Sequence, residues 1–291
     1  MPFEVISPGT VRELLKVTRQ LDGKNFRFGA GCTDLVNELQ KEPGEGLSVI
    51  NLGWIKDKRL TEIKNEISGI RIGARVTANN ILLYETVRKR FPVLWEAANV
   101  LASPQIRQVA TVGGNICTAS PAGDIACALL ALNSDCEMIS PEKKTRTLPI
   151  EQFFVNVRKT VLQKGEILYS IHIPRNDATS VRFHSGFIKV GTRRSMECAV
   201  VSLAYHFQVD RGDKIIRAGI AIGSAAPVIK FARSACELIT GKKISSFTDA
   251  DRNEFAQRVV SYAQPISDIR GSAWYRKEVL FNISKSILEG K

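Results

Sequence analysis

Several features that mark other classes of protein are missing from this 291-residue chain. No stretch approaches the roughly 18 consecutive apolar residues of a membrane-spanning helix. The opening residues, MPFEVISPGTVRELLK, lack the basic region, apolar stretch and cleavage site of a signal peptide. No internal repeat or low-complexity tract is visible, which argues against solenoid and fibrous architectures. We therefore expect a globular protein in the cytoplasm.

Short cysteine spacings are also missing. The six cysteines include no Cys-x-x-Cys pair, although zinc and iron–sulfur ligands usually occur at such spacings. We predict that this chain binds no metal and that its cysteines are reduced thiols. No Ser-His-Asp arrangement or pair of carboxylates is recognisable, so we expect no catalytic acid, base or nucleophile.

Acidic residues are few relative to basic ones, with 29 Asp and Glu against 41 Lys and Arg and a net charge of +12. This surplus could favour nucleic acid, an anionic cofactor or an acidic partner subunit. The basic residues occur in short groups such as RKR at 88–90 and KKTR at 143–146. A solvated basic surface is the simplest interpretation, and a nucleic-acid-binding module is the alternative.

The length fits two or three structural units, and helix and strand patterns alternate in the first half. Thr10 and Glu13 have the spacing of a capping box at the start of a helix. The apolar patterns predict strands in FRFG, LSVINL, GIRIGARVT, DCEMIS and EILYSIHIP, and helices after Asp34, over 77–90 and 91–102, and in DIACALLALNS.

The polar segment from Pro174 to Ser180 is the best boundary on composition. Beyond it, three long β-type runs, VRFHSGFIKV, CAVVSLAYHFQVD and KIIRAGIAIGSAAPV, precede amphipathic stretches at 231–239, 248–263 and 272–288. Strands followed by helices in blocks predict an α+β unit.

Two glycine turns stand before helical segments, GAGCTD at 29–34 and TVGGNICTASPAGDI at 111–125. Glycine lets backbone N–H groups approach a ligand closely, and a helix start adds a partial positive charge. Neither turn has the lysine of a P-loop or the third glycine of a Rossmann turn. On the residues alone, each turn is either a pyrophosphate-binding loop or a structural corner.

These motifs resemble the flavoprotein subunits of molybdenum-containing hydroxylases, a family that includes xanthine, carbon monoxide and nicotinate dehydrogenases. AGCTDL at 30–35 is similar to the first flavin motif of that family, and 111–125 to the second. The resemblance continues through SPQIRQVA, GEILYSIHIP and the Lys-x-x-x-Arg of FIKVGTRRSMECAV, so it covers almost the whole chain.

The resemblance implies an α+β fold with a vanillyl-alcohol-oxidase-type FAD-binding domain at 1–176, in subdomains of about 1–57 and 58–176. A C-terminal domain like that of the carbon monoxide dehydrogenase flavoprotein would occupy 177–291. The break at Pro174 to Ser180 falls at this expected boundary.

The resemblance also implies which residues bind FAD. The backbone of the first motif would hold one side of the pyrophosphate, with Thr33 adding a hydroxyl, and Gly113 and Gly114 would offer bare backbone on the other. Asp124 would accept from ribose hydroxyls, Leu168 would contact the flavin ring, and Lys189 would reach its polar edge. The full set is Ala30, Gly31, Cys32, Thr33, Asp34, Leu35, Leu101, Ala110, Thr111, Gly114, Asn115, Ser120, Asp124, Leu168 and Lys189.

Two residues depart from the family pattern. Cys32 stands where the first motif usually has a second glycine, so either this position accepts a side chain or the loop is displaced. Leu101 stands at the position of an aromatic residue that packs on the flavin in the animal enzymes.

The family resemblance implies an electron-transfer subunit that carries FAD. It would take electrons from iron–sulfur clusters ([2Fe-2S]) on one partner and pass them to NAD or another acceptor. A second partner would bind molybdopterin, in a dimer of heterotrimers, and overall similarity favours a xanthine dehydrogenase type. The alternatives are a stand-alone flavin reductase of the same fold and the basic nucleic-acid-binding module.

Overall fold

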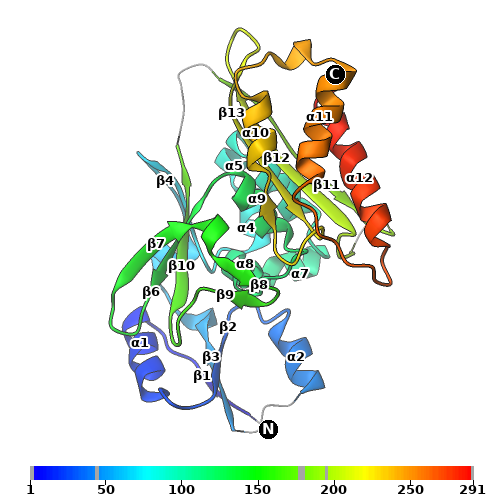
Figure 1. Ribbon diagram of the computed structural model, residues 1–291. Helices are drawn as coiled ribbons and strands as arrows, with labels where there is room; N and C mark the ends of the chain where they lie inside the picture. Colours follow the sequence, from blue (N-terminus) through cyan, green and yellow to red (C-terminus); the bar gives the residue numbers. More distant parts are fainter. Residues whose placement is uncertain (1–2, 43–45, 176–180, 194–195, 290–291) are drawn as a thin grey trace.

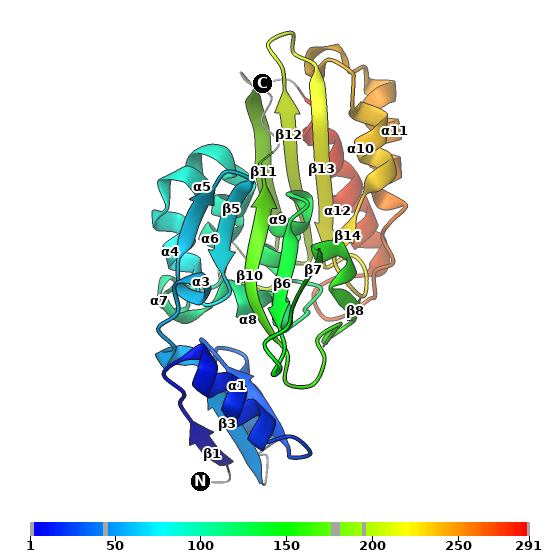
Figure 2. The same cartoon turned by 90° about the vertical axis from the view of Figure 1, so that its left-hand side faces the viewer.

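The N-terminal part of the molecule is a small parallel sheet with two helices, set apart from the remainder in Figure 2. The computed structural model describes residues 3–42, 46–175, 181–193 and 196–289. The strand order is β1-β3-β2, and the central strand β3 is almost completely buried. Its elements are β1 (Phe3–Ile6), α1 (Val11–Gln20), β2 (Phe26–Gly29), α2 (Leu35–Lys41) and β3 (Leu47–Asn51).

Helix α1 begins as the sequence predicts, but the predicted capping box is incomplete. The Thr10 hydroxyl accepts a hydrogen bond from Glu13 N–H at 3.1 Å, which confirms the predicted cap. The Glu13 carboxylate instead accepts from Gly9 N–H at 2.8 Å. It therefore stabilises the chain one residue before the cap.

A five-stranded antiparallel sheet of order β4-β5-β10-β6-β7 forms the middle of the molecule (Figure 1). Helices of the same part lie between it and the C-terminal sheet. The strands are β4 (Ile63–Glu66), β5 (Gly69–Gly73), β6 (Asp135–Ile139), β7 (Thr145–Pro149) and β10 (Ile167–Pro174), with a small hairpin of β8 (Phe154–Asn156) and β9 (Lys159–Thr160). The helices are α3 (Lys58–Thr61), α4 (Ala78–Leu83), α5 (Glu85–Arg90), α6 (Pro92–Asn99), α7 (Pro104–Val109), α8 (Val112–Cys117) and α9 (Asp124–Ala131), with 3-10 turns at Leu52–Trp54 and Ile150–Gln152.

The C-terminal part is a four-stranded antiparallel sheet with helices on one face (Figures 1 and 2). The strands are β11 (Arg182–Val190), β12 (Val201–Val209), β13 (Ile215–Gly223) and β14 (Lys230–Phe231), and the helices are α10 (Arg233–Ile239), α11 (Asp249–Val260) and α12 (Ala273–Ser286), with a 3-10 turn at Ile244–Ser246. No helix in the described part of the chain is long and apolar enough to cross a membrane.

The C-terminal sheet uses both of its faces because side chains alternate along each strand. His184 contacts the rings of Tyr205 and Phe207 on one face and hydrogen-bonds to the carbonyl of Ile287, beside α12, at 2.8 Å. On the opposite face, His206 of β12 packs near Phe91, and α9 lies against β12 and β13. The sheet therefore joins the C-terminal helices to the middle part of the molecule.

The longer elements are where the sequence predicts them, including the three long strands and three helices after residue 180. Several short elements were not predicted, among them β1, β4, α7 and α8. Such elements have too few residues to show a periodic pattern of apolar side chains, so this pattern could not predict them. Of the predicted boundary at Pro174 to Ser180, residues 176–180 lie outside the described residues.

The approach of α9 to β13 generates the first prediction. A Cβ atom on Gly219 would overlap the carbonyl oxygen of Ala131, at the end of α9. We expect Gly219→Ala to lower the free energy of unfolding by about 1–3 kcal/mol, the usual cost of overpacking. Urea denaturation measures this. Gly9→Ala is the control, because its Cβ would be 3.5 Å from the Glu13 carboxylate, and equal stability of the two variants would contradict the prediction.

Candidate functional site

The first glycine turn joins β2 to α2 at the carboxyl end of the parallel sheet. The carbonyl groups of residues 32–34 accept hydrogen bonds from the first turn of α2 at 2.9–3.1 Å. The N–H groups of residues 31–35 have no hydrogen-bond partner within the described chain. A turn whose N–H groups point outward together forms an anion-binding concavity.

Cys32 gives this turn its shape. Its φ of 56° lies in the left-handed region that favours glycine, which explains why the related motif has glycine there. The side chain is half-buried, and its Sγ lies 3.8 Å from the carbonyl oxygen of Ala30. Burial raises the pKa of the Cys32 thiol. Of the two alternatives that the sequence left open, the structure shows that the position accepts a side chain in the glycine-type conformation.

The two glycine turns are in direct contact although they are far apart in sequence. A Cβ on Gly31 would overlap the carbonyl oxygen of Val109, so only glycine permits this approach. The hydroxyl of Thr118 donates to Asp34 Oδ2 at 3.1 Å, which makes a second contact between the turns. Ala110, the next residue after Val109, is thereby placed beside the first turn.

The second turn corrects one expectation from the sequence. Gly113 N–H donates to the carbonyl of Ala74 at 2.7 Å, and Gly114 N–H donates to the hydroxyl of Thr111 at 3.0 Å. Asn115 N–H donates to the carbonyl of Thr111 at 3.0 Å. These backbone groups are used to form α8, so Gly113 and Gly114 do not offer free N–H groups to a ligand. The first turn, by contrast, keeps the N–H groups of residues 31–35 without a partner in the described chain.

Two polar side chains of the second turn hold the segment that leads into α9. Asn115 Oδ1 accepts from Ala126 N–H at 3.0 Å, and Ser120 Oγ accepts from Ala122 N–H at 3.2 Å. The Asn115 amide nitrogen has no partner among the residues described, so it is a further available donor. Both side chains thus shape the turn directly before Asp124.

Asp124 and Lys189 form the central ion pair of the site. Asp124 is the first residue of α9 and is only 2% exposed, and its Oδ2 lies 2.6 Å from Nζ of Lys189 in β11. Lys189 Nζ also lies 3.3 Å from the carbonyl oxygen of Val100. The sequence assigned these two side chains to different parts of a ligand and did not predict that they touch.

The other oxygen of this carboxylate is unpaired. Asp124 Oδ1 is buried and accepts no hydrogen bond from any described residue. Burial raises the pKa of Asp124 to about 6, although the adjacent charge and hydrogen bond of Lys189 lower it. An unsatisfied carboxylate oxygen in a buried position is costly, so this site is suited to a ligand that donates a hydrogen bond.

The two leucines that the resemblance assigns to the site lie in different parts of the chain. Leu101 follows Val100 and is half-buried, and its carbonyl accepts from Arg107 at 3.0 Å. Leu168 is 4% exposed in β10, and its backbone is within hydrogen-bonding reach of the Cys117 thiol in α8. Leu101 thus follows the residue whose carbonyl contacts Lys189, and Leu168 contacts α8, the helix of the second turn.

Sequence reasoning missed several residues that build this region. Arg158 N–H donates to the carbonyl of Ala119 at 3.0 Å, and its guanidinium lies 3.2 Å from Glu38 Oε1 in α2. The hairpin that carries Arg158 therefore connects the second turn to the N-terminal part. Arg107 and Thr118 were also missed, because single polar residues in short segments give no pattern from which contacts could be predicted.

The buried carboxyl generates the second prediction, on cofactor-free protein. Between pH 4 and 6 the folded state retains the Asp124 proton and the unfolded state, with a pKa near 3.8, does not. The free energy of unfolding should therefore fall as pH rises through this window, by about 3 kcal/mol from this group. Urea denaturation of wild type and Asp124→Asn across pH 4–7 isolates the contribution. Exposed Asp22→Asn is the control, and parallel profiles for wild type and Asp124→Asn would contradict the prediction.

The donors and acceptors of the region fit an FAD molecule. Five N–H groups without a partner in the described chain suit a pyrophosphate, and the unpaired Asp124 oxygen suits a ribose or ribityl hydroxyl. The contact between Gly31 and Val109 holds the two turns together, and Lys189 places a cation beside Asp124.

Comparison with known proteins agrees with this interpretation. The family model described as the FAD binding domain in molybdopterin dehydrogenase matches residues 1–176, and that of the CO dehydrogenase flavoprotein C-terminal domain matches residues 187–289.

Similar proteins match over nearly their full length. The glyceraldehyde dehydrogenase medium chain of Sulfolobus acidocaldarius is 29% identical, covering 96% of this chain and 94% of that protein. The xanthine dehydrogenase FAD-binding subunit of Escherichia coli O157:H7 is 26% identical, covering 92% and 89%. The solved structure of carbon monoxide dehydrogenase from Hydrogenophaga pseudoflava matches with a TM-score of 0.89 and 26% identity, over 98% of this chain and 96% of that one. The chain therefore belongs to the FAD-binding subunits of the molybdenum hydroxylase family, the flavoprotein components of oxidoreductases.

Proposed function

We propose that this chain is the electron-transfer subunit of a molybdenum hydroxylase, receiving electrons from iron–sulfur clusters of one partner and delivering them to NAD or another acceptor. The observation that carries the proposal is the buried Asp124 carboxylate, which is paired with Lys189 on one oxygen and has no partner on the other. The turn at residues 31–35, with its unpaired N–H groups, supports it. FAD supplies the electron-carrying chemistry when it is bound, and the chain supplies binding and electrostatics.

We assign separate roles to the two turns and to the ion pair. The N–H groups of residues 31–35 bind the pyrophosphate, and Thr111, Gly114 and Asn115 act by shaping the adjacent turn. Asp124 Oδ1 accepts a hydrogen bond from a cofactor hydroxyl. Lys189 places a positive charge near the flavin, but its 2.6 Å bond to Asp124 offsets that charge in part. Leu101 and Leu168 supply apolar contacts.

The proposal extends to the substrate of the complex and to the electron acceptor. A xanthine-type substrate and NAD remain our predictions, supported by the similarity to the xanthine dehydrogenase subunit. Glyceraldehyde and carbon monoxide are competing possibilities because those names belong to relatives with similar coverage. We place substrate binding on a molybdopterin-carrying partner, so residues of this chain do not select the substrate.

We also retain the domain division at 1–176 and 177–291, the cytoplasmic location and the dimer of heterotrimers as proposals. The ranges of the two matching family models support the division. Relatives that are named as medium chains or subunits support an assembly with partner chains.

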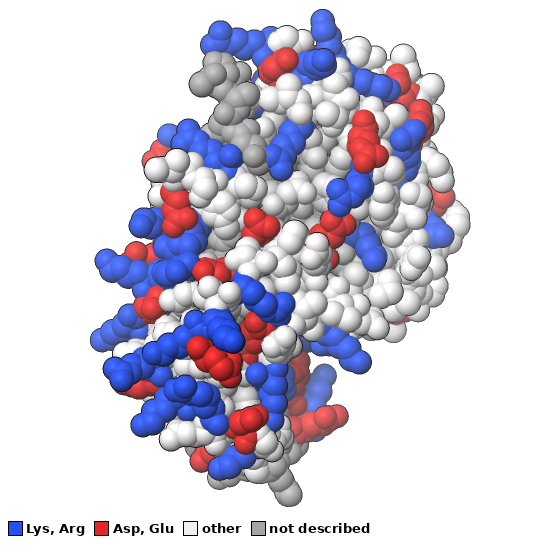
Figure 3. Space-filling view, turned by 60° about the vertical axis from the view of Figure 1, so that its left-hand side comes forward, with Lys and Arg blue, Asp and Glu red and all other residues white. Residues whose placement is uncertain are grey.

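The alternatives are less well supported. On the face shown in Figure 3, Lys and Arg side chains are interspersed with Asp and Glu, which differs from the continuous basic surface that nucleic acid requires. A stand-alone flavin reductase would need its own substrate-binding acid or base. We found no further feature of the described site that supplies one.

The third prediction concerns cofactor binding. We expect Asp124→Ala to weaken FAD binding about tenfold or more, because it removes an acceptor for a cofactor hydroxyl. Cys32→Gly should retain FAD, since glycine adopts the φ of 56° readily. Flavin absorbance after gel filtration and titration of cofactor-free protein with FAD measure the difference. Equal FAD affinity of the two variants would contradict the assignment of Asp124, and failure of the wild type to bind FAD would contradict the flavoprotein proposal.

The fourth prediction concerns the partners. Affinity purification of the tagged chain from its native cells should recover two further subunits, one with the visible spectrum of iron–sulfur clusters and one with molybdenum. Metal analysis and absorbance spectra identify them, and a mock-tagged strain is the control. A chain that purifies alone and reduces an acceptor by itself would instead support the stand-alone reductase.

A further inference from the structure

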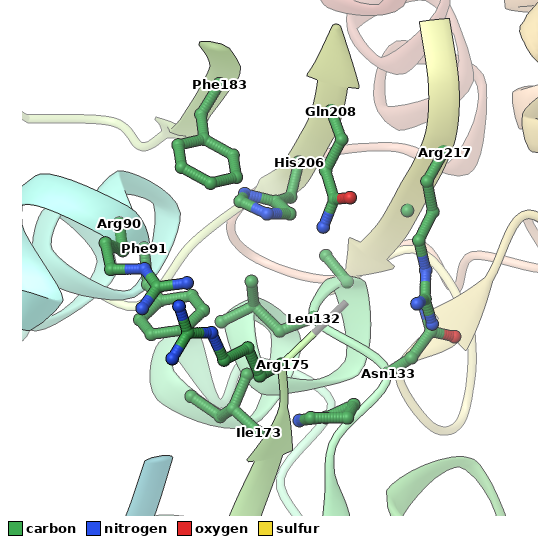
Figure 4. A pocket seen from close by; sticks show the side chains of 13 residues that line it. Arg90, Phe91, Leu132, Asn133, Ile173, Arg175, Phe183, His206, Gln208 and Arg217 are labelled. Atoms are coloured by element: carbon green, nitrogen blue, oxygen red, sulfur yellow. The ribbon is translucent and has the colours of Figure 1, made fainter. Parts of the chain in front are cut away.

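A second polar site lies at the other end of α9, away from Asp124. It is a pocket between the C-terminal sheet and the ends of α5, α9 and β10, with a cavity volume of about 20 Å³ (Figure 4). Its polar lining comes from Arg90, Asn133, Arg175, His206, Gln208 and Arg217. No role in the proposed electron transfer involves these residues.

One face of the C-terminal sheet forms the wall of the pocket. Gln208 of β12 is in register with Phe183 of β11 and with Arg217 of β13, so these three side chains stand on the same face. His206 lies two residues before Gln208 and therefore also faces the pocket. In Figure 4, His206 and Gln208 point from β12 toward the space bordered by Phe91, Leu132 and Arg175.

Two side chains in the wall are buried and incompletely bonded. Gln208 is 7% exposed, and its amide makes no hydrogen bond with any described residue. His206 is also 7% exposed; its Nδ1 lies 3.0 Å from the hydroxyl of Ser185, whereas Nε2 has no described partner. Because Ser185 Oγ already accepts from Val93 N–H, the simplest pairing has this hydroxyl donate to Nδ1, which leaves the ring proton on Nε2. Both residues can thus donate into the pocket.

The charge around the pocket is positive. Arg217 makes no hydrogen bond or ion pair with a described residue, and none of the residues lining the pocket is acidic. Arg90 and Arg175 line the pocket but each has another interaction, so we do not assign them as donors to a ligand. The end of α9 opposes Arg217 with about half an elementary negative charge, which is smaller than the charge of one guanidinium group. Burial, followed by the charge of Arg217, lowers the pKa of His206 to about 4.

We infer that this pocket binds the phosphate group of a small molecule, with Arg217, the Gln208 amide and His206 Nε2 as its donors. A cavity of about 20 Å³ holds one or two water-sized atoms. That volume matches one or two phosphate oxygens, and the rest of the ligand would lie between the arginine side chains. The guanidinium of Arg217 with two further donors on β12 suits a tetrahedral anion, which offers more acceptor oxygens than a single carboxylate.

The test uses the chain with FAD bound, so that the proposed pyrophosphate site is filled. Isothermal titration with inorganic phosphate and with glycerol 3-phosphate, at constant ionic strength, should show binding, and acetate should bind more weakly. Arg217→Gln should lower phosphate affinity about tenfold, because a hydrogen bond to a charged group is lost. Gln208→Glu should abolish binding, because it replaces a donor with a negative charge.

The control is Arg258→Gln, which removes the same charge from α11. Arg258 is not among the residues that line the pocket. This variant should retain wild-type affinity. Thermal unfolding of each variant shows that it is folded, and Arg217→Gln suits this test because Arg217 is only partly buried. Each of three results would overturn the inference. The first is no phosphate binding by wild type up to about 20 mM, which corresponds to about 2 kcal/mol of binding free energy. The others are tighter binding of acetate than of phosphate, and equal phosphate affinity of Arg217→Gln and Arg258→Gln. Because FAD content is measured separately, none of these results alters the flavoprotein assignment.

Discussion

The ion pair between Asp124 and Lys189 is the interaction on which the site depends. A carboxylate that is only 2% exposed requires compensation, and its cation comes from β11, 65 positions along the chain. Asp124 lies in the matching range of the FAD-binding family model, and Lys189 in that of the C-terminal one. The polar centre is therefore complete only when the C-terminal sheet packs on α9. The C-terminal part therefore contributes a residue directly to the candidate site.

The long elements of the fold could be predicted because their periodicity and caps are local properties of the sequence. Thr10 caps α1 through a contact three residues away, and β11, β12 and β13 each provide enough residues to show a strand pattern. The short elements depend on distant partners instead. Strand β1 forms because it pairs with β3, more than forty residues later, and a four-residue segment carries no period of its own.

For the candidate site, the sequence predicted which segments form it but not which of their groups bond to one another. Motif resemblance identified both turns, and the structure brings them together through Gly31 and Val109. Motif resemblance did not show which backbone N–H groups remain free. That depends on the hydrogen bonds that Gly113 N–H donates to Ala74 and Gly114 N–H donates to Thr111. The glycines of the second turn serve packing and helix formation. The contact of Asp124 with Lys189 could not be predicted either, because local sequence patterns do not show contacts between distant residues.

Helix α9 links the features of the molecule that were hardest to predict. All eight of its residues are buried, its first residue binds Lys189 of β11, and its last meets Gly219 of β13 without room for a side chain. Both ends are thus fixed to one sheet, and a displacement of that sheet relative to α9 must change the polar contact at one end or the close packing at the other. This explains why a mostly apolar helix begins with a buried acid. The acid fixes the position of the helix on the sheet, and its second oxygen has no hydrogen-bond partner among the described residues.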